Sequence, residues 1–209
     1  MKYISLGIQC HITTALTELN IRNCAYPFDW HFVPSKATYE ILEILINKGI
    51  DEACEYMTTD YMYYEFIKCE YYTKVDIPTQ FQINPKNGLG IVHYSINDDV
   101  IQQLKTRLTR LLDDIKIGDN ITFIYADCAG PNVNYYIDNI EYGLDANEYL
   151  EKIFNLIFFI NKNIKIIYFC WPERKLTSNN IIHVVFDYKN HWNDVVPIIK
   201  DYLCNEINK

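Results

Sequence analysis

The second half of the chain alternates continuous apolar runs with helical segments, and no other feature constrains the fold as strongly. Buried strands are predicted at three of these runs, 121–126, 164–169 and 181–186. Helices are predicted over 145–160 and 192–205. Continuous apolar strands separated by helices indicate a mainly parallel sheet. We therefore predict one α/β domain over residues 1–209, with a mainly parallel mixed sheet covered by helices on both faces.

The first part of the chain predicts a strand, a helix, a turn and a second helix. The strand covers 1–6, Gly7 opens a turn, and apolar residues then recur at helical spacing as far as Asn20. A second helix begins at about Ser35, which is a candidate N-cap. Cys10 is therefore expected at or beside the first turn of a helix that directly follows a strand.

Between 49 and 90 the sequence is irregular, aromatic and broken by prolines, which predicts a long excursion with short strands or helices over the core. An element that gates or selects the substrate would lie in this excursion. A short strand at 91–94 follows, and Asp98 or Asp99 then caps a helix that ends near Gly118.

Charge and hydropathy argue against two classes of partner. The net charge of −8 and the pI of about 5.1 disfavour nucleic acid, because binding a phosphate backbone needs a basic face. The apolar run at 153–160 is too short to cross a bilayer, and the first residues lack the basic and extended apolar segments of a secretion signal. We expect no nucleic-acid partner, no membrane and no secretion.

The seven cysteines are odd in number, scattered, and form no C-x-x-C pair. A disulfide framework or a zinc site is therefore not expected, and a reducing compartment fits this usage best. We expect a cytoplasmic protein, in the host cytoplasm if it is viral.

Cys10 has two interpretations. The N–H groups that are left unpaired at the start of a helix favour negative charge, so they can stabilise a thiolate, which is the nucleophilic form of cysteine. Alternatively, Cys10 is a small buried hydrophobic residue, which is the usual role of a free cysteine.

Two motifs favour the first interpretation. The segment Ser5-Leu6-Gly7-Ile8-Gln9-Cys10 and the later Tyr26-Pro27-Phe28-Asp29-Trp30 resemble the putative papain-like cysteine peptidase family, found in bacteria and large DNA viruses. The resemblance is carried by about the first 35 residues, and it implies a Cys10 nucleophile and a His93 base.

The segment around Cys10 differs from the C-G-S-C-W pattern of ordinary papains, and no glutamine stands six residues upstream. The resemblance therefore supports thiol chemistry more directly than peptide hydrolysis. It also brings an alternative fold class, the α+β architecture of papain-like enzymes.

Three side chains fall at predicted strand ends and match a catalytic triad by type. Cys10 follows the first strand, His93 lies in the strand before the long helix, and Asp127 comes directly after 121–126. The ends of parallel strands meet at one edge of a sheet, where a nucleophile, a base and an orienting acid can act together. The alternatives are a histidine bonded to the backbone at the core edge and an aspartate that only caps a turn.

Three further residues are candidates. Asp29 competes with Asp127 to orient His93, although an aspartate flanked by aromatics more often accepts backbone N–H groups within its own turn. The Gln9 side chain is a candidate oxyanion donor. His191 is a reserve base, or else part of a structural first turn of the last helix.

Together these residues predict a thiol hydrolase or acyltransferase that needs no metal and no organic cofactor. Cys10 attacks the carbonyl of a peptide or other acyl substrate, and His93 transfers the proton to the leaving group. The alternative is an inactive relative that binds a protein or glycan through the aromatic excursion. A nucleotide-dependent transferase has no support, because no G-x-G-x-x-G loop occurs.

Overall fold

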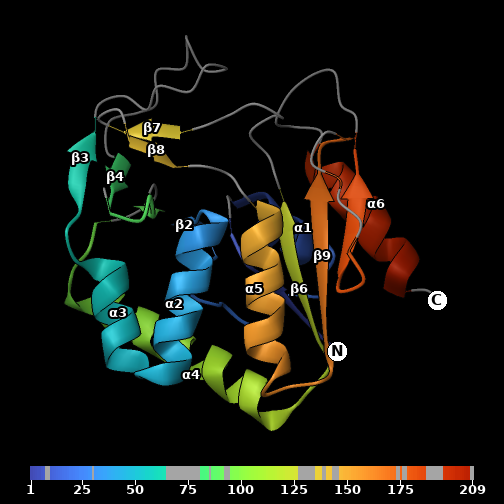
Figure 1. Ribbon diagram of the computed structural model, residues 1–209, viewed down its shortest axis with the longest axis horizontal. Coiled ribbons are helices and arrows are strands. Elements are labelled where there is room, and N and C mark those ends of the chain that lie inside the picture. The colour runs from blue at the N-terminus through green and yellow to red at the C-terminus, as the bar shows by residue number, and fades with distance from the viewer. Residues whose placement is uncertain are drawn as a thin grey trace.

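The computed structural model (Figure 1) describes residues 1–7, 10–29, 31–64, 81–84, 86–91, 95–126, 135–137, 140–142, 146–172, 175, 178–186 and 195–207. Its main sheet has four strands, and all neighbouring strands are parallel. In spatial order the strands are β1 (Lys2–Ser5), β6 (Ile121–Ala126), β9 (Ile164–Cys170) and β10 (Ile181–Val185). The three apolar runs of the second half are thus strands of one parallel sheet, as predicted.

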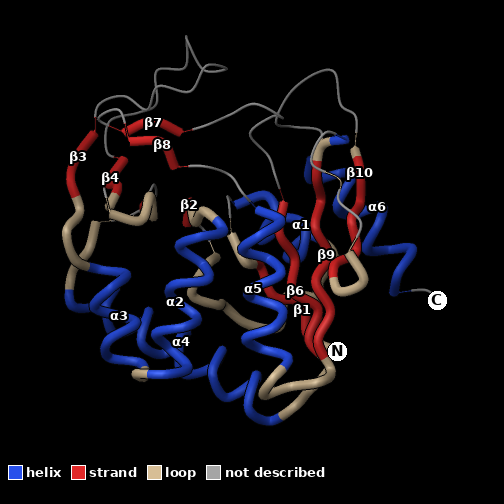
Figure 2. Tube along the Cα trace, in the orientation of Figure 1, coloured by secondary structure: helices blue, strands red, loops and turns tan. Residues whose placement is uncertain are grey.

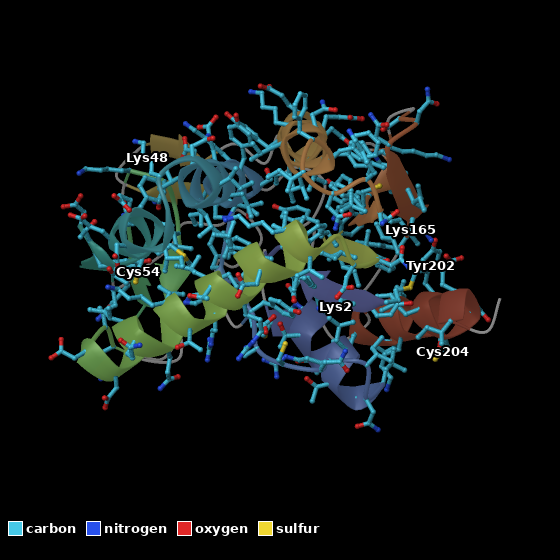
Figure 3. The ribbon with its side chains drawn as sticks, turned by 90° about the horizontal axis from the view of Figure 1, so that it is seen from below. Lys2, Lys48, Cys54, Lys165, Tyr202 and Cys204 are labelled. Atoms are coloured by element: carbon cyan, nitrogen blue, oxygen red, sulfur yellow. The ribbon has the colours of Figure 1, made fainter. Side chains whose placement is uncertain are left out.

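Helices cover both faces of this sheet. On one face α5 (Ala146–Phe158) contacts β9 and β10 and packs against α2 (Ser35–Asn47). On the other face α1 (Cys10–Glu18) contacts β1 and β6 and packs against α6 (Val195–Ile207). Figure 1 shows α5 in front of the sheet and α1 behind it, and Figure 3 shows the same layers from below. The predicted α/β class is confirmed.

The central strands have side chains buried on both faces, which explains why they read as unbroken apolar runs. All six residues of β6 are buried, as are the last five of β9. Among the described strands β10 pairs only with β9, and only Ile181 of its five residues is buried. The apolar core is therefore centred on β6 and β9.

A second sheet is small and antiparallel (Figure 2). Its strands, in spatial order, are β2 (His31–Phe32), β5 (Gly90–Ile91), β4 (Phe81–Ile83) and β3 (Met62–Tyr64). A separate hairpin joins β7 (Tyr135–Ile137) to β8 (Ile140–Tyr142). Three of the strands and α3 (Ile50–Thr58) come from the predicted excursion and the end of it. Antiparallel strands therefore form their own sheets instead of joining the parallel one.

Two predicted N-caps differ from those of the structure, although the helix predicted to begin at about Ser35 does begin there. Pro34 is the N-cap of α2, and Ser35 is its first helical residue. The N-cap of α4 (Asp98–Ile117) is Asn97, whose side chain accepts a hydrogen bond from the Val100 N–H at 2.9 Å. An asparagine serves this role as well as an aspartate does. The end of α4 at Gly118, in the left-handed conformation, is as predicted.

A buried carboxylate on α4 ties the N-terminal segment to the rest of the fold. Asp114 accepts hydrogen bonds from Lys2 Nζ at 2.7 Å and from the Tyr26 hydroxyl at 2.5 Å. On the same helix, Arg110 donates to the carbonyl oxygen of Ala25. Because Lys2 is in β1 and Tyr26 begins the Tyr-Pro-Phe-Asp-Trp motif, α4 fixes the motif relative to the first strand.

Candidate active site around Cys10

Cys10 is the first residue of α1, a few residues beyond the end of β1, as the sequence predicts. The Leu6 N–H donates to the Ile124 carbonyl at 2.8 Å, so the chain leaves the sheet beside β6. Cys10 is half-buried, and its thiol is free. The site thus has a cysteine at a helix start above the carboxyl end of the sheet, where ligands of α/β proteins commonly bind.

Gly7 allows the chain to pass unusually close to the segment before α2. Its φ is +105°, and a Cβ built on it would lie 2.7 Å from Val33 Cβ. An L side chain fits neither this backbone conformation nor this spacing. The neighbouring Leu6 carbonyl accepts a hydrogen bond from Thr38 Oγ1 at 2.9 Å. The link between β1 and α1 is therefore held against the start of α2.

Two opposing effects act on the Cys10 thiol. Burial raises its pKa, and the backbone N–H at the start of α1 acts in the opposite direction and lowers it. The effect of burial is the larger, so the pKa is raised overall. The helix start acts in the direction predicted from the sequence but does not by itself produce a thiolate. Reaction at neutral pH then requires a base that removes the proton.

Asp29 is almost fully buried and accepts hydrogen bonds from three residues of its own neighbourhood. Its Oδ2 accepts from the Tyr26 N–H at 2.8 Å and from Arg22 Nη2 at 2.9 Å. Its Oδ1 accepts from Thr13 Oγ1 at 3.1 Å. The interpretation that Asp29 accepts a backbone N–H within its own turn is confirmed. The carboxylate also neutralises Arg22 and bonds to α1 one turn after Cys10.

The same turn leads into the small antiparallel sheet. β2 begins two residues after Asp29, and its His31 pairs with Ile91 of β5. β5 ends two residues before position 93. The hydrogen bond from Thr13 to Asp29 and the pairing of β2 with β5 therefore connect the helix of Cys10 to the strand that precedes His93.

Four candidate residues lie outside the described part of the chain: Gln9, His93, Asp127 and His191. Their predicted roles stay predictions, although the elements beside them are described. β6 ends at Ala126 and is the parallel neighbour of β1. α6 begins four residues after position 191 and packs against α1, with Lys200 Nζ 2.6 Å from Glu18 Oε2.

Comparison with protein families identifies the N-terminal part of the chain. Residues 1–134 match the family described as putative papain-like cysteine peptidase (DUF1796). The chain belongs to this family. The matched range includes Cys10, Asp29, His93 and Asp127 but ends before His191. A search of curated proteins and a search of solved structures each found no match.

Two histidines of this family member are almost fully buried. Only 3% of the surface of His11 and 2% of the surface of His31 is exposed. Burial lowers the pKa of His11 to about 4, so its ring is neutral at pH 7. The sequence indicates the burial of His11, because His11 and the apolar Ala15 are four residues apart and so lie on the same face of the helix.

Neither a bilayer-spanning helix nor a metal-binding cluster occurs in the described ranges. No helix there has the length and apolar character needed to cross a bilayer. No group of three or more His, Cys, Asp or Glu side chains is suitably placed to hold a metal ion among the described residues.

Proposed function

We propose that this family member is a thiol-dependent hydrolase or acyltransferase of the cysteine peptidase type. Cys10 is the nucleophile, His93 its base, and Asp127 the acid that orients the base. One observation carries the proposal: the contacts of Asp29 and the pairing of β2 with β5 connect the start of α1 to the strand before position 93. Membership of a family described as cysteine peptidases supports it.

The raised pKa of Cys10 makes the base essential to this mechanism. As Sγ bonds to the substrate carbonyl carbon, the thiol proton passes to His93. The tetrahedral intermediate then collapses, its bond to the leaving group breaks, and the leaving group takes that proton. Water or another nucleophile attacks the acyl-cysteine and releases the thiol. Gln9 and the first N–H of α1 stabilise the oxyanion.

The substrate is a peptide or another acyl compound, and the acidic chain makes nucleic acid an unsuitable partner. The protein acts in a reducing compartment such as the cytoplasm, or the host cytoplasm if it is viral. The free thiols of Cys10, Cys24 and Cys54 are consistent with that setting.

Alkylation by iodoacetamide, followed by peptide mass mapping, tests this proposal. Cys204 on α6 is exposed, and Figure 3 shows it at the periphery of the molecule, so it supplies the reference rate for an exposed cysteine. We expect Cys10 to react faster than Cys204 at pH 7 although it is half-buried. The buried Cys54, whose pKa burial also raises, should react most slowly of the three.

The His93→Gln variant supplies the matched control. It should slow alkylation of Cys10 at pH 7 and leave the rate at Cys204 unchanged. Treatment with p-nitrophenyl acetate should then acetylate Cys10 in the wild type and not in this variant. If Cys10 reacts no faster than Cys204 and the variant changes nothing, the protein is instead an inactive relative that binds its partner.

A further inference from the structure

Ser35 has a buried hydroxyl group that forms no hydrogen bond with any described residue. None of the residue's surface is exposed, and Oγ has no hydrogen-bond partner in the part of the chain that is described. An unsatisfied buried hydroxyl reduces stability, so a native protein rarely retains one without a reason. Removing the hydroxyl would improve the fold, unless the group binds something else.

The position of Ser35 indicates what it faces. Ser35 and Thr38 are three residues apart in α2 and so lie on the same face of the helix. Thr38 Oγ1 donates to the carbonyl oxygen of Leu6, and Val33 contacts Gly7. Ser35 therefore lies on the side of α2 that faces the link between β1 and Cys10.

The first N–H groups of α2 also have no acceptor among the described residues. Pro34 is the N-cap and provides no side-chain cap, and the first N–H that donates within the helix belongs to Thr38. Pro34 and Ser35 are buried, so water does not freely replace the missing acceptor. Uncapped N–H groups and the helix dipole favour a negatively charged oxygen there.

Two helices thus begin near Gly7. α1 begins three residues after it, at Cys10, and α2 begins at Ser35, two residues after Val33, which lies against Gly7. In Figure 1, α2 begins at the same end of the molecule to which β6 and β9 point. A chain with a net charge of −8 repels anions in general, so an anionic ligand needs such local donors.

We propose that Ser35 and the first N–H groups of α2 bind a carboxylate of the substrate, beside the carbonyl that Cys10 attacks. This inference rests on the proposed function for the role of Cys10. It narrows the substrate class to acyl compounds that carry a carboxylate near the scissile bond. Ser35 is then a residue that determines specificity, and it takes no part in the proton transfers.

Two alkylating reagents of similar size test this proposal, neutral iodoacetamide and anionic iodoacetate. The iodoacetate-to-iodoacetamide rate ratio is measured at Cys10 and at Cys204 of the same protein, and Cys204 corrects for intrinsic reactivity and overall charge. We expect this ratio to be roughly tenfold higher at Cys10 than at Cys204, which corresponds to a free-energy difference of about 1.4 kcal/mol. Sodium acetate should slow the reaction of Cys10 with iodoacetamide more than sodium chloride does.

In the Ser35→Ala variant, the iodoacetate-to-iodoacetamide rate ratio at Cys10 should fall to the value measured at Cys204. Acetate should no longer protect Cys10 from alkylation. Its melting temperature should be unchanged or higher, because it loses an unsatisfied hydroxyl. Thr106→Ala is the matched control, since its exposed hydroxyl donates only to the Gln102 carbonyl within α4. It should leave the ratio unchanged.

Equal ratios at Cys10 and Cys204 in the wild type would overturn the carboxylate site. A clear loss of melting temperature in Ser35→Ala would also overturn it, because the hydroxyl would then have a structural partner. Both outcomes are independent of His93, so the hydrolase proposal could still hold. Conversely, the iodoacetate-to-iodoacetamide ratio could be high at Cys10 while His93→Gln leaves the alkylation rate of Cys10 unchanged. That result would support anion binding at a site that is not catalytic.

Discussion

Replacing Asp29 by alanine separates a structural carboxylate from a catalytic one. The substitution removes the acceptor for the Tyr26 N–H, for Thr13 Oγ1 and for Arg22. Asp29 is 2% exposed and the Arg22 side chain 20%, so water does not fully replace the three lost interactions. The variant should therefore be much less stable, with an intrinsic reactivity of Cys10 that changes little while the protein stays folded.

The expected loss follows from these contacts. An orphaned buried N–H costs about 1–3 kcal/mol, and breaking a fully buried ion pair costs about 3–5 kcal/mol. Because Arg22 can turn its partly exposed end to water, its lost ion pair should cost less than a fully buried one, about 2 kcal/mol, and with the orphaned N–H we expect about 3–4 kcal/mol in total. For a chain of this length that is a decrease of roughly 6–16 °C in melting temperature.

Urea and thermal unfolding measure the loss, and iodoacetamide labelling in the folded range measures Cys10. Asp29→Asn keeps a neutral acceptor and should lose less stability than Asp29→Ala. Asp51→Ala, which removes an exposed partner of Lys105, should hardly change the melting temperature. An Asp29→Ala variant that keeps its melting temperature but loses the reactivity of Cys10 would refute the structural assignment and make Asp29 the orienting acid.

Two further predictions concern Gly7 and His11. Gly7→Ala should destabilise the protein by about 2–3 kcal/mol in urea unfolding, since the new methyl group would clash with Val33 in addition to the strain of positive φ. Gly118→Ala also has a positive φ but meets no neighbour, so it should cost about 1 kcal/mol. Equal losses of stability in the two variants would contradict this prediction. Because the pKa of His11 is lowered in the folded state to about 4, its stabilising effect is complete above pH 6.5 and is lost as the pH falls. Between pH 7.5 and pH 5 the free energy of unfolding of the wild type should fall. This decrease should be about 2 kcal/mol larger than the decrease measured for His11→Leu.

The parallel sheet was predictable because its central strands bury both faces and so have unbroken apolar sequences, as in Ile121–Ala126. The pairing of β2 with β5 could not be predicted, since a strand of two residues shows no periodicity and the two strands are far apart in the sequence. The N-caps of α2 and α4 differed from prediction because several residues near each start can serve as caps.

The sequence correctly predicted that Cys10 lies at the start of a helix, but it did not predict whether the pKa of its thiol is raised or lowered. A strand, a glycine turn and a helical stripe are local features, and they place the cysteine at the first turn of α1. The pKa instead depends on burial, to which distant segments contribute, and burial outweighs the helix start. The partners of Asp29 were equally hidden, because Thr13 and Arg22 meet it only when α1 and the following turn have folded.

The engagement of Asp29 bears on which acid could orient a histidine beside Cys10. Both carboxylate oxygens of Asp29 already accept hydrogen bonds from described residues, and one of them neutralises Arg22. A carboxylate that gave up these donors to hold an imidazole would leave a buried N–H and an arginine unsatisfied. β6 is the parallel neighbour of β1 and ends at Ala126, one residue before Asp127 in the sequence. On this reasoning the Asp29 turn holds the framework in place, and the orienting acid is expected after β6.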